Sequence, residues 1–300
     1  MANLDELLVK TSRTFALAIP LLPEPCKLEV TIAYLLFRIA DTFEDAAVWP
    51  REQRLAALGD FAALLSKPDP VRALELTTQW SAARPIEHEG YLELLAETPA
   101  VLEALASLSP SARHIVTRHA IRTTEGMAEV VQRTDNRGNL QLRDVEDLKS
   151  YCYIVAGIVG ELLTELFILD APQLHAVAGE LNQHAIAFGE ALQLVNILKD
   201  SDDDAEDGRV FLPPKSERGP IFELAREDLR CAKRYVAALH EAEAPAGFLA
   251  FTSLPVLLAQ ATLDRVEALG PGAKVERGEV VAMMAHVHNA IDHHNNPLAI

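Results

Sequence analysis

Two pairs of aspartates are the side chains in this sequence whose type and spacing could do chemistry. The stretch RIADTFED (38–45) contains Asp41 and Asp45, and Asp200 and Asp204 repeat the same four-residue spacing further along the chain. At about 100° per residue, the two members of a pair share one stripe of a helix. One such pair alone is typical of a solvated acidic helix end. A second copy, again after an apolar helix, indicates a shared site if the two helices pack together.

Polar and basic residues accompany both acidic pairs. Gln193 and Asn196 precede the second pair on the same helical stripe. Carboxylate and amide oxygens suit Mg²⁺, which usually binds a few carboxylates together with substrate phosphates. Arg38, Lys199 and Arg209 stand beside the acids and could hold the phosphate oxygens that the metal leaves free. The pattern therefore predicts a Mg²⁺ site that binds a phosphorylated substrate.

The elements that must position these residues are helices. The chain has 300 residues, of which 49% are hydrophobic and 6% aromatic, and strand-type alternation is scarce. This composition predicts an all-α protein that is long enough to bury a sizeable core. Short clusters of helix-breaking residues divide the chain near residues 21–25, 66–70, 107–112, 212–220 and 269–273. None of them has the length or bias of a linker, so we predict a single domain over residues 1–300.

The net charge limits which partners the protein can bind, and the cysteine content indicates where it is located. A formal net charge of −17 argues against nucleic acid and against electrostatic docking on anionic lipid. The three cysteines have no paired spacing and the N-terminus is acidic, so we expect a cytoplasmic protein. Residues 244–263 carry no charge, but they include Pro245 and Pro255. We interpret this stretch as a buried helix that lines an apolar cavity, not as a membrane span.

The stretch between the two acidic pairs is apolar. Residues 151–167 predict a helix that contains Ala156, Gly157 and Gly160, although an interior glycine costs up to about 1 kcal/mol. Such small residues serve either tight packing between helices or a groove for a long hydrocarbon chain. Together with the Mg²⁺ site, a dry apolar groove would suit an allylic diphosphate, because the cation left by the departing diphosphate must be kept from water.

Four blocks of sequence carry a resemblance to a known family. They are SRTF (12–15), RIADTFED (38–45), YCYIVAGIVG (151–160) and LQLVNILKDSDDDAEDGRVFLP (192–213). In this order they resemble the squalene/phytoene synthase family of head-to-head prenyl transferases. The resemblance implies an isoprenoid synthase-type helical bundle with a central apolar cavity. Two further stretches, FTSLPVLLAQATL (251–263) and GAKVERGEVV (272–281), resemble the squalene synthase branch.

The resemblance also implies roles for the matching residues. It assigns Mg²⁺ and diphosphate binding to Asp41, Asp45, Asp200 and Asp204, with Gln193 and Asn196 beside them. It assigns contacts with diphosphate to Ser12, Thr14, Arg38, Lys199 and Arg209. Lys199 stands where many members have arginine, which keeps the charge and loses the bidentate geometry. Tyr151 would lie near the leaving group, and Phe251 would stabilise a carbocation through its ring face.

The resemblance implies the condensation of two farnesyl diphosphates, through presqualene diphosphate, to squalene, with Mg²⁺ and NADPH as cofactors. Lys274 and Arg277 are candidate contacts for the NADPH phosphates, or else solvated charges beside a loop. Three alternatives stay open. They are a dehydrosqualene, phytoene or presqualene diphosphate synthase without the reduction, a metal-dependent phosphohydrolase, and a non-catalytic helical scaffold.

The predicted partner is an isoprenoid diphosphate. The C-terminal stretch DHHNNPLAI (292–300) has no hydrophobic anchor, so we expect at most peripheral membrane contact during product release. The sequence carries no signal for an oligomeric state.

Overall fold

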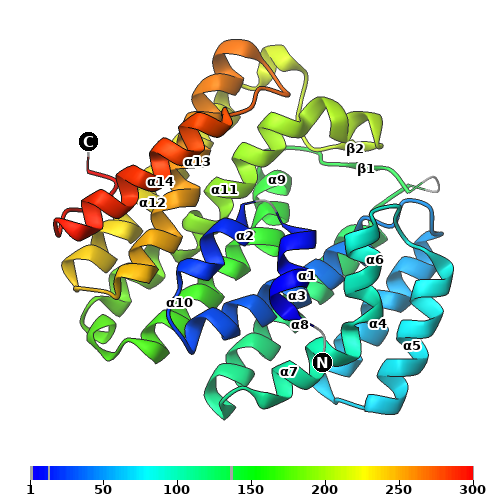
Figure 1. The fold of residues 1–300 in the computed structure, drawn as a ribbon. Coiled ribbons are helices and arrows are strands. Elements are labelled where there is room, and N and C mark those ends of the chain that lie inside the picture. Colours follow the sequence, from blue (N-terminus) through cyan, green and yellow to red (C-terminus); the bar gives the residue numbers. More distant parts are fainter. Residues whose placement is uncertain (1–2, 13, 136–137, 300) are drawn as a thin grey trace. The chain divides into compact units, whose positions relative to one another are not determined.

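The structure is a computed structural model that describes residues 3–12, 14–135 and 138–299. Nearly all of its regular structure is helical (Figure 1), which confirms the predicted all-α class. The chain divides into two compact units: Met1–Ile19 with Glu24–Leu140, and Pro20–Pro23 with Gln141–Ile300. The single domain stays a prediction. Arg13 of the SRTF block lies outside the described residues.

The first unit contains eight α-helices within its described residues. They are α1 (Leu4–Thr11), α2 (Phe15–Ala18), α3 (Cys26–Glu44), α4 (Arg51–Ser66), α5 (Pro70–Ala83), α6 (Glu89–Ala96), α7 (Thr98–Ser107) and α8 (Pro110–Gln132). The central helix is α3, which packs against α1, α4, α6, α7 and α8. Near its end, Phe43 contacts the rings of Trp49, Phe61 and Trp80, with centroid distances of 6.1, 6.1 and 4.7 Å. This aromatic cluster anchors the end of α3 that carries the first acidic pair.

The second unit is built around the longest helix of the described chain. Its helices are α9 (Val145–Cys152), the π-helical turn η2 (Tyr153–Gly157), α10 (Ile158–Asp170), η3 (Pro172–Val177), α11 (Ala178–Glu206), η4 (Lys215–Glu217), α12 (Gly219–Glu241), α13 (Ala246–Leu269) and α14 (Arg277–Asp292). Helix α11 packs against α9, η2, α10, α12 and α13. The short strand β2 (Arg209–Val210) pairs with β1 (Leu140–Gln141). The turn η1 (Ile19–Leu21) and strand β1 lie where the chain passes between the units.

Capping residues explain where several helices begin. The Asp69 carboxylate accepts the N–H groups of Val71 and Arg72, and Pro70 occupies the first turn of α5. Ser109 caps α8 in the same way, again with a proline in the first turn. A side-chain acceptor followed by proline satisfies N–H groups that have no partner inside the helix. These local signals confirm the breaks predicted near residues 66–70 and 107–112.

Two glycines bring the backbones of neighbouring helices into contact in the second unit. A Cβ atom on Gly160 of α10 would lie 1.9 Å from the carbonyl oxygen of Ala185 on α11. A Cβ atom on Gly189 of α11 would lie 2.0 Å from the carbonyl oxygen of Ala156 in η2. At both points only a residue without a side chain fits. The small residues of this stretch therefore serve tight helix packing, which is one of the two interpretations the sequence allowed.

In the part of the chain that the structure describes, two helical segments are long and apolar enough to cross a membrane by length and composition. They are Val145–Asp170 and Ala246–Leu269. In the most apolar 18-residue stretch of the first segment, 50% is buried inside the protein. In the corresponding stretch of the second segment, 61% is buried. Core helices have the same composition when their surface is covered by neighbours. The second segment overlaps the stretch that the sequence predicts as a buried helix.

Replacing Gly160 with alanine is expected to lower the free energy of unfolding by about 3 kcal/mol, because the new methyl group overlaps a backbone carbonyl that cannot move alone. Gly59, inside α4, is the matched control, since a Cβ there meets nothing within 4 Å. Gly59→Ala should raise stability by about 0.5–1 kcal/mol. Chemical denaturation of both variants measures the difference. Equal stability changes would contradict the close approach of α10 and α11.

Candidate active site

The first acidic pair lies at the C-terminal end of α3. Asp41 is in the last turn, and Asp45 is the residue that ends the helix. Arg38 contacts Asp41, with 3.1 Å between Nη1 and Oδ2. Burial raises the pKa of Asp41 to about 6, Arg38 opposes the rise and Asp45 adds to it. A cation placed between the two carboxylates would restore the charged form of Asp41.

The predicted diphosphate contacts before α3 lie between α1 and α2. The N–H of Ser12 ends α1 by donating to the carbonyl of Leu8, and its hydroxyl oxygen accepts the N–H of Phe15 at 2.9 Å. A serine hydroxyl that accepts one bond still has its own proton to donate, as a phosphate oxygen requires. Thr14 is exposed. The Tyr34 hydroxyl donates to the carbonyl of Thr11 at 2.7 Å and so joins this segment to α3.

The second acidic pair lies near the C-terminal end of α11, each member beside a cation. The distance from Lys199 Nζ to Asp200 Oδ2 is 3.1 Å, and that from Arg209 Nη2 to Asp204 Oδ1 is 3.0 Å. Arg209 reaches back from β2, directly after the helix. Lys199 and Arg209, which the sequence predicts beside the second acidic pair, thus each form an ion pair with one of its members.

Gln193 and Asn196 are on the same helix as the second pair. Gln193 is half-buried and Asn196 is exposed. Asn196 precedes Asp200 by about one turn and Gln193 precedes it by about two turns. Their amide groups are therefore available beside the carboxylates as neutral hydrogen-bonding groups.

The two predicted aromatic residues are both buried in the second unit. Tyr151, in the last turn of α9, stacks on Phe211 with 4.8 Å between ring centroids. Phe251, on α13, meets Phe167 edge to face at 6.1 Å. Buried rings of this kind present fixed faces rather than mobile side chains.

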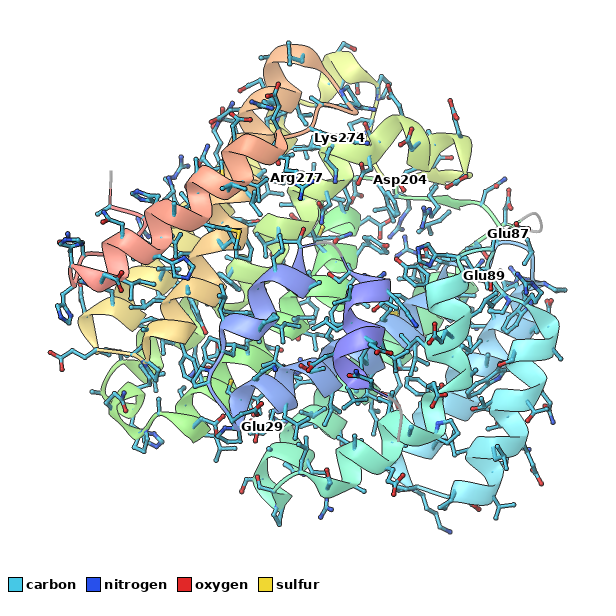
Figure 2. All side chains as sticks on the ribbon, in the orientation of Figure 1. Glu29, Glu87, Glu89, Asp204, Lys274 and Arg277 are labelled. Carbon is cyan, nitrogen blue, oxygen red and sulfur yellow. The ribbon has the colours of Figure 1, made fainter. Side chains whose placement is uncertain are left out.

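Lys274 and Arg277 lie at the connection between α13 and α14, where Figure 2 labels both. Both side chains are exposed. The carbonyl of Lys274 accepts a hydrogen bond from Arg265, and the N–H of Gly272 donates to the carbonyl of Lys199 at 2.7 Å. The backbone of this connection is therefore attached to α11 next to Asp200.

The donor groups of each acidic pair fit Mg²⁺. Within the described residues, no group of three or more aspartate, glutamate, histidine or cysteine side chains could hold a metal ion. Each pair supplies two carboxylates, and Mg²⁺ commonly binds through one or two carboxylates, with phosphate oxygens and waters completing its octahedron. The raised pKa of Asp41 marks a carboxyl group that lacks a nearby cation strong enough to offset its burial.

Sequence reasoning missed a second group of titratable side chains in the second unit. Glu190 on α11 and Asp228 on α12 are each 8% exposed. Burial raises the pKa of Glu190 to about 7, with Asp228 adding to the rise and Lys149 of α9 opposing it. Burial likewise raises the pKa of Asp228 to about 6. Among the described residues, Asp228 Oδ2 has no hydrogen-bond partner.

A signal for this buried acid was present in the sequence. Asp228 falls at the period that buries its neighbours on α12, between Ala225 and Ala232. An acid within the apolar stripe of a helix is expected to be buried with its neighbours. Because burying a charge without a partner is costly, such an acid is worth noting as a candidate for an unusual protonation state.

Most of the chain is similar to known proteins. The sequence profile of the squalene/phytoene synthase family matches residues 8–216. The squalene synthase of Schizosaccharomyces pombe is 28% identical over 95% of this chain and 64% of its own length. A squalene synthase of Candida albicans is 31% identical over 69% of this chain and 44% of its own length. The chain thus spans less than two thirds of these relatives.

Solved structures with a similar fold include two that bind ligands. A ligand complex of the protein called TcSQS has a TM-score of 0.75 and 24% identity, covering 95% of this chain and 85% of that chain. A dehydrosqualene synthase in complex with a ligand has a TM-score of 0.60 and 18% identity, covering 97% of this chain and 95% of that chain. At these identities the likeness establishes a shared all-α fold.

The raised pKa values of the buried acids predict how stability depends on pH. A carboxyl group whose pKa is higher in the folded state binds its proton more tightly when folded, so stability falls as the pH rises from about 4 to 7. Asp228→Asn removes one such group, and we expect it to raise the free energy of unfolding by about 1–2 kcal/mol at pH 8. At pH 4.5 the gain should be small. Denaturation at both pH values measures it.

Asp264→Asn on α13 is the control, because it removes the same charge from an exposed position. Its effect should stay within about 0.5 kcal/mol at both pH values. A gain for Asp228→Asn that is equal at the two pH values would contradict the buried titration.

Proposed function

Because the chain belongs to the squalene/phytoene synthase family, we propose that it catalyses the Mg²⁺-dependent head-to-head condensation of two farnesyl diphosphates, through presqualene diphosphate, to squalene. The proposal rests on one observation: a pair of aspartates lies near the end of each of two apolar helices. Asp41, Asp200 and Asp204 each form an ion pair with a basic side chain. Paired acids and cations are what a diphosphate with its metal ions requires.

In the first half of the proposed reaction, one farnesyl diphosphate loses its diphosphate to leave an allylic cation. The double bond of the other attacks this cation, and loss of a proton closes the cyclopropane ring of presqualene diphosphate. When bound, Mg²⁺ neutralises charge on the leaving diphosphate. In the first unit, Arg38 would add positive charge to the oxygens of a bound diphosphate, and the Ser12 hydroxyl has a proton to donate to such oxygens. In the second unit, Arg209 would do the same for a diphosphate bound at Asp204.

In the second half, presqualene diphosphate loses its own diphosphate and its carbon skeleton rearranges. Tyr151, held by its stacking on Phe211, would guide the departing group. The buried ring of Phe251 would stabilise the cation through its face. NADPH, when bound, supplies the hydride that ends the reaction, and Lys274 and Arg277 would hold its phosphates.

Partners and location form part of the same proposal. The protein would bind isoprenoid diphosphates and no nucleic acid, since its net charge of −17 repels polyanions. We propose that it acts in the cytoplasm and contacts a membrane only peripherally, when the apolar product leaves. A helical phosphohydrolase is the second candidate and would release free farnesol, because it admits water where a synthase excludes it.

Asp41→Asn and Asp200→Asn are each expected to lower the rate of presqualene diphosphate formation at least about 100-fold, since each removes a metal-binding charge. Folding should be retained, because each also relieves repulsion with a second acid. Asp202→Asn is the control: Asp202 is exposed on α11 and faces away from the acidic stripe by helical period. Near-wild-type turnover of Asp41→Asn or Asp200→Asn would refute the metal-site assignment.

Product analysis decides the proposed function itself. Purified protein with farnesyl diphosphate and Mg²⁺ should form presqualene diphosphate without NADPH and squalene with it. An identical coupled product in both reactions would leave the condensation intact and refute the reductive step, as for a dehydrosqualene synthase. Free farnesol alone would favour the phosphohydrolase.

A further inference from the structure

The Arg38 guanidinium lies over two tyrosine rings in the first unit. Its central carbon is 5.7 Å from the ring centroid of Tyr34, one turn earlier on α3, and 5.3 Å from that of Tyr91 on α6. Both distances are within the range of cation–π attraction. Tyr91 belongs to a part of the sequence where no motif indicates a functional residue, and it comes from a different helix.

Arg38 needs such support because it has little water around it. Its side chain is 26% exposed, and its Nε is buried with no hydrogen-bond partner among the described residues. Burial by itself would lower the pKa of Arg38, but Asp41 and the two tyrosines hold that pKa above its ordinary value. The aromatic faces therefore replace part of the hydration that the guanidinium has lost.

Contacts of α6 with α1 fix the place of Tyr91. A Cβ atom on Gly90 would lie 2.6 Å from the carbonyl oxygen of Lys10, so the start of α6 lies directly against α1. The Lys10 ammonium pairs with Glu93 at 2.7 Å. The Tyr91 ring also stacks on His88, with 4.3 Å between centroids. Burial raises the pKa of the Tyr91 phenol, so the group that meets Arg38 is a neutral ring.

We propose that Tyr91 is a positioning residue that holds Arg38 in the orientation in which it binds a diphosphate group. This inference rests on the proposed function, since it deepens the role of Arg38 at that site. Tyr91 acts through Arg38: it restricts a long, flexible side chain between two rings and Asp41, so that less conformational entropy is lost when the phosphate binds. The ring face, and not the hydroxyl, carries the effect.

Two variants separate the ring from the hydroxyl. Tyr91→Leu removes the aromatic face, whereas Tyr91→Phe keeps it. Calorimetry with inorganic pyrophosphate and Mg²⁺ should give about tenfold weaker binding for Tyr91→Leu and binding within about twofold of wild type for Tyr91→Phe. With farnesyl diphosphate, Tyr91→Leu should raise KM more than it lowers kcat. Wild-type affinity in Tyr91→Leu, or an equal loss in both variants, would overturn the proposal.

A double-mutant cycle with Arg38→Gln tests whether Tyr91 acts through Arg38. If it does, Tyr91→Leu causes no further loss of pyrophosphate affinity once Arg38 is gone. A side chain that only supports the fold would cause the same loss in both backgrounds, and that result would also overturn the proposal. The double-mutant cycle measures the affinity for pyrophosphate and does not depend on catalytic turnover. If the wild-type protein binds pyrophosphate but forms no presqualene diphosphate, the proposed function fails while this test keeps its meaning.

Discussion

The close approach of two helix backbones in the second unit constrains much of what surrounds it. At Gly160 and Gly189, the carbonyl oxygen of a neighbouring helix occupies the space that a Cβ atom would need. The helices η2, α10 and α11 can therefore pack only in a register that keeps a glycine at both points. That register sets where the second half of α11 runs. Asp200 and Asp204 sit on this half, and Tyr151 leads directly into η2. The positions of Asp200 and Asp204 thus depend on a backbone contact several turns away.

Carboxyl groups on α3, α11 and α12 have lost part of their water. Burial raises the pKa of Asp41, Arg38 opposes this rise, and Asp45 adds to it. Burial also raises the pKa values of Glu190 and Asp228, and a single lysine, Lys149, opposes the rise. Sites that bind charged ligands commonly hold such uncompensated groups, because the ligand then supplies what the protein lacks. For Asp41 a divalent cation fits this description.

Arg38 illustrates how a fold prepares a cation for an anion. A carboxylate alone would neutralise the guanidinium and compete with a phosphate for its N–H groups. Aromatic faces attract the charge and leave the edge of the guanidinium free to donate. Helix α6, held against α1 by Gly90, supplies one of these faces from outside the recognised motifs. The surroundings of Arg38 therefore include a helix that lies outside the four blocks of sequence that resemble the family.

The amino-acid sequence by itself determined the all-α class, the helix breaks and the two acidic stripes with their basic neighbours. These features are local: caps, prolines and a period of 3.6 residues act within a few turns. Only the tertiary structure decided that Tyr91 meets Arg38, that Asp228 faces Glu190, and that Gly189 matches Gly160 across a helix interface. Such contacts join residues far apart in the chain. They depend on how side-chain volumes fill a shared interior, and no short stretch of sequence contains that information.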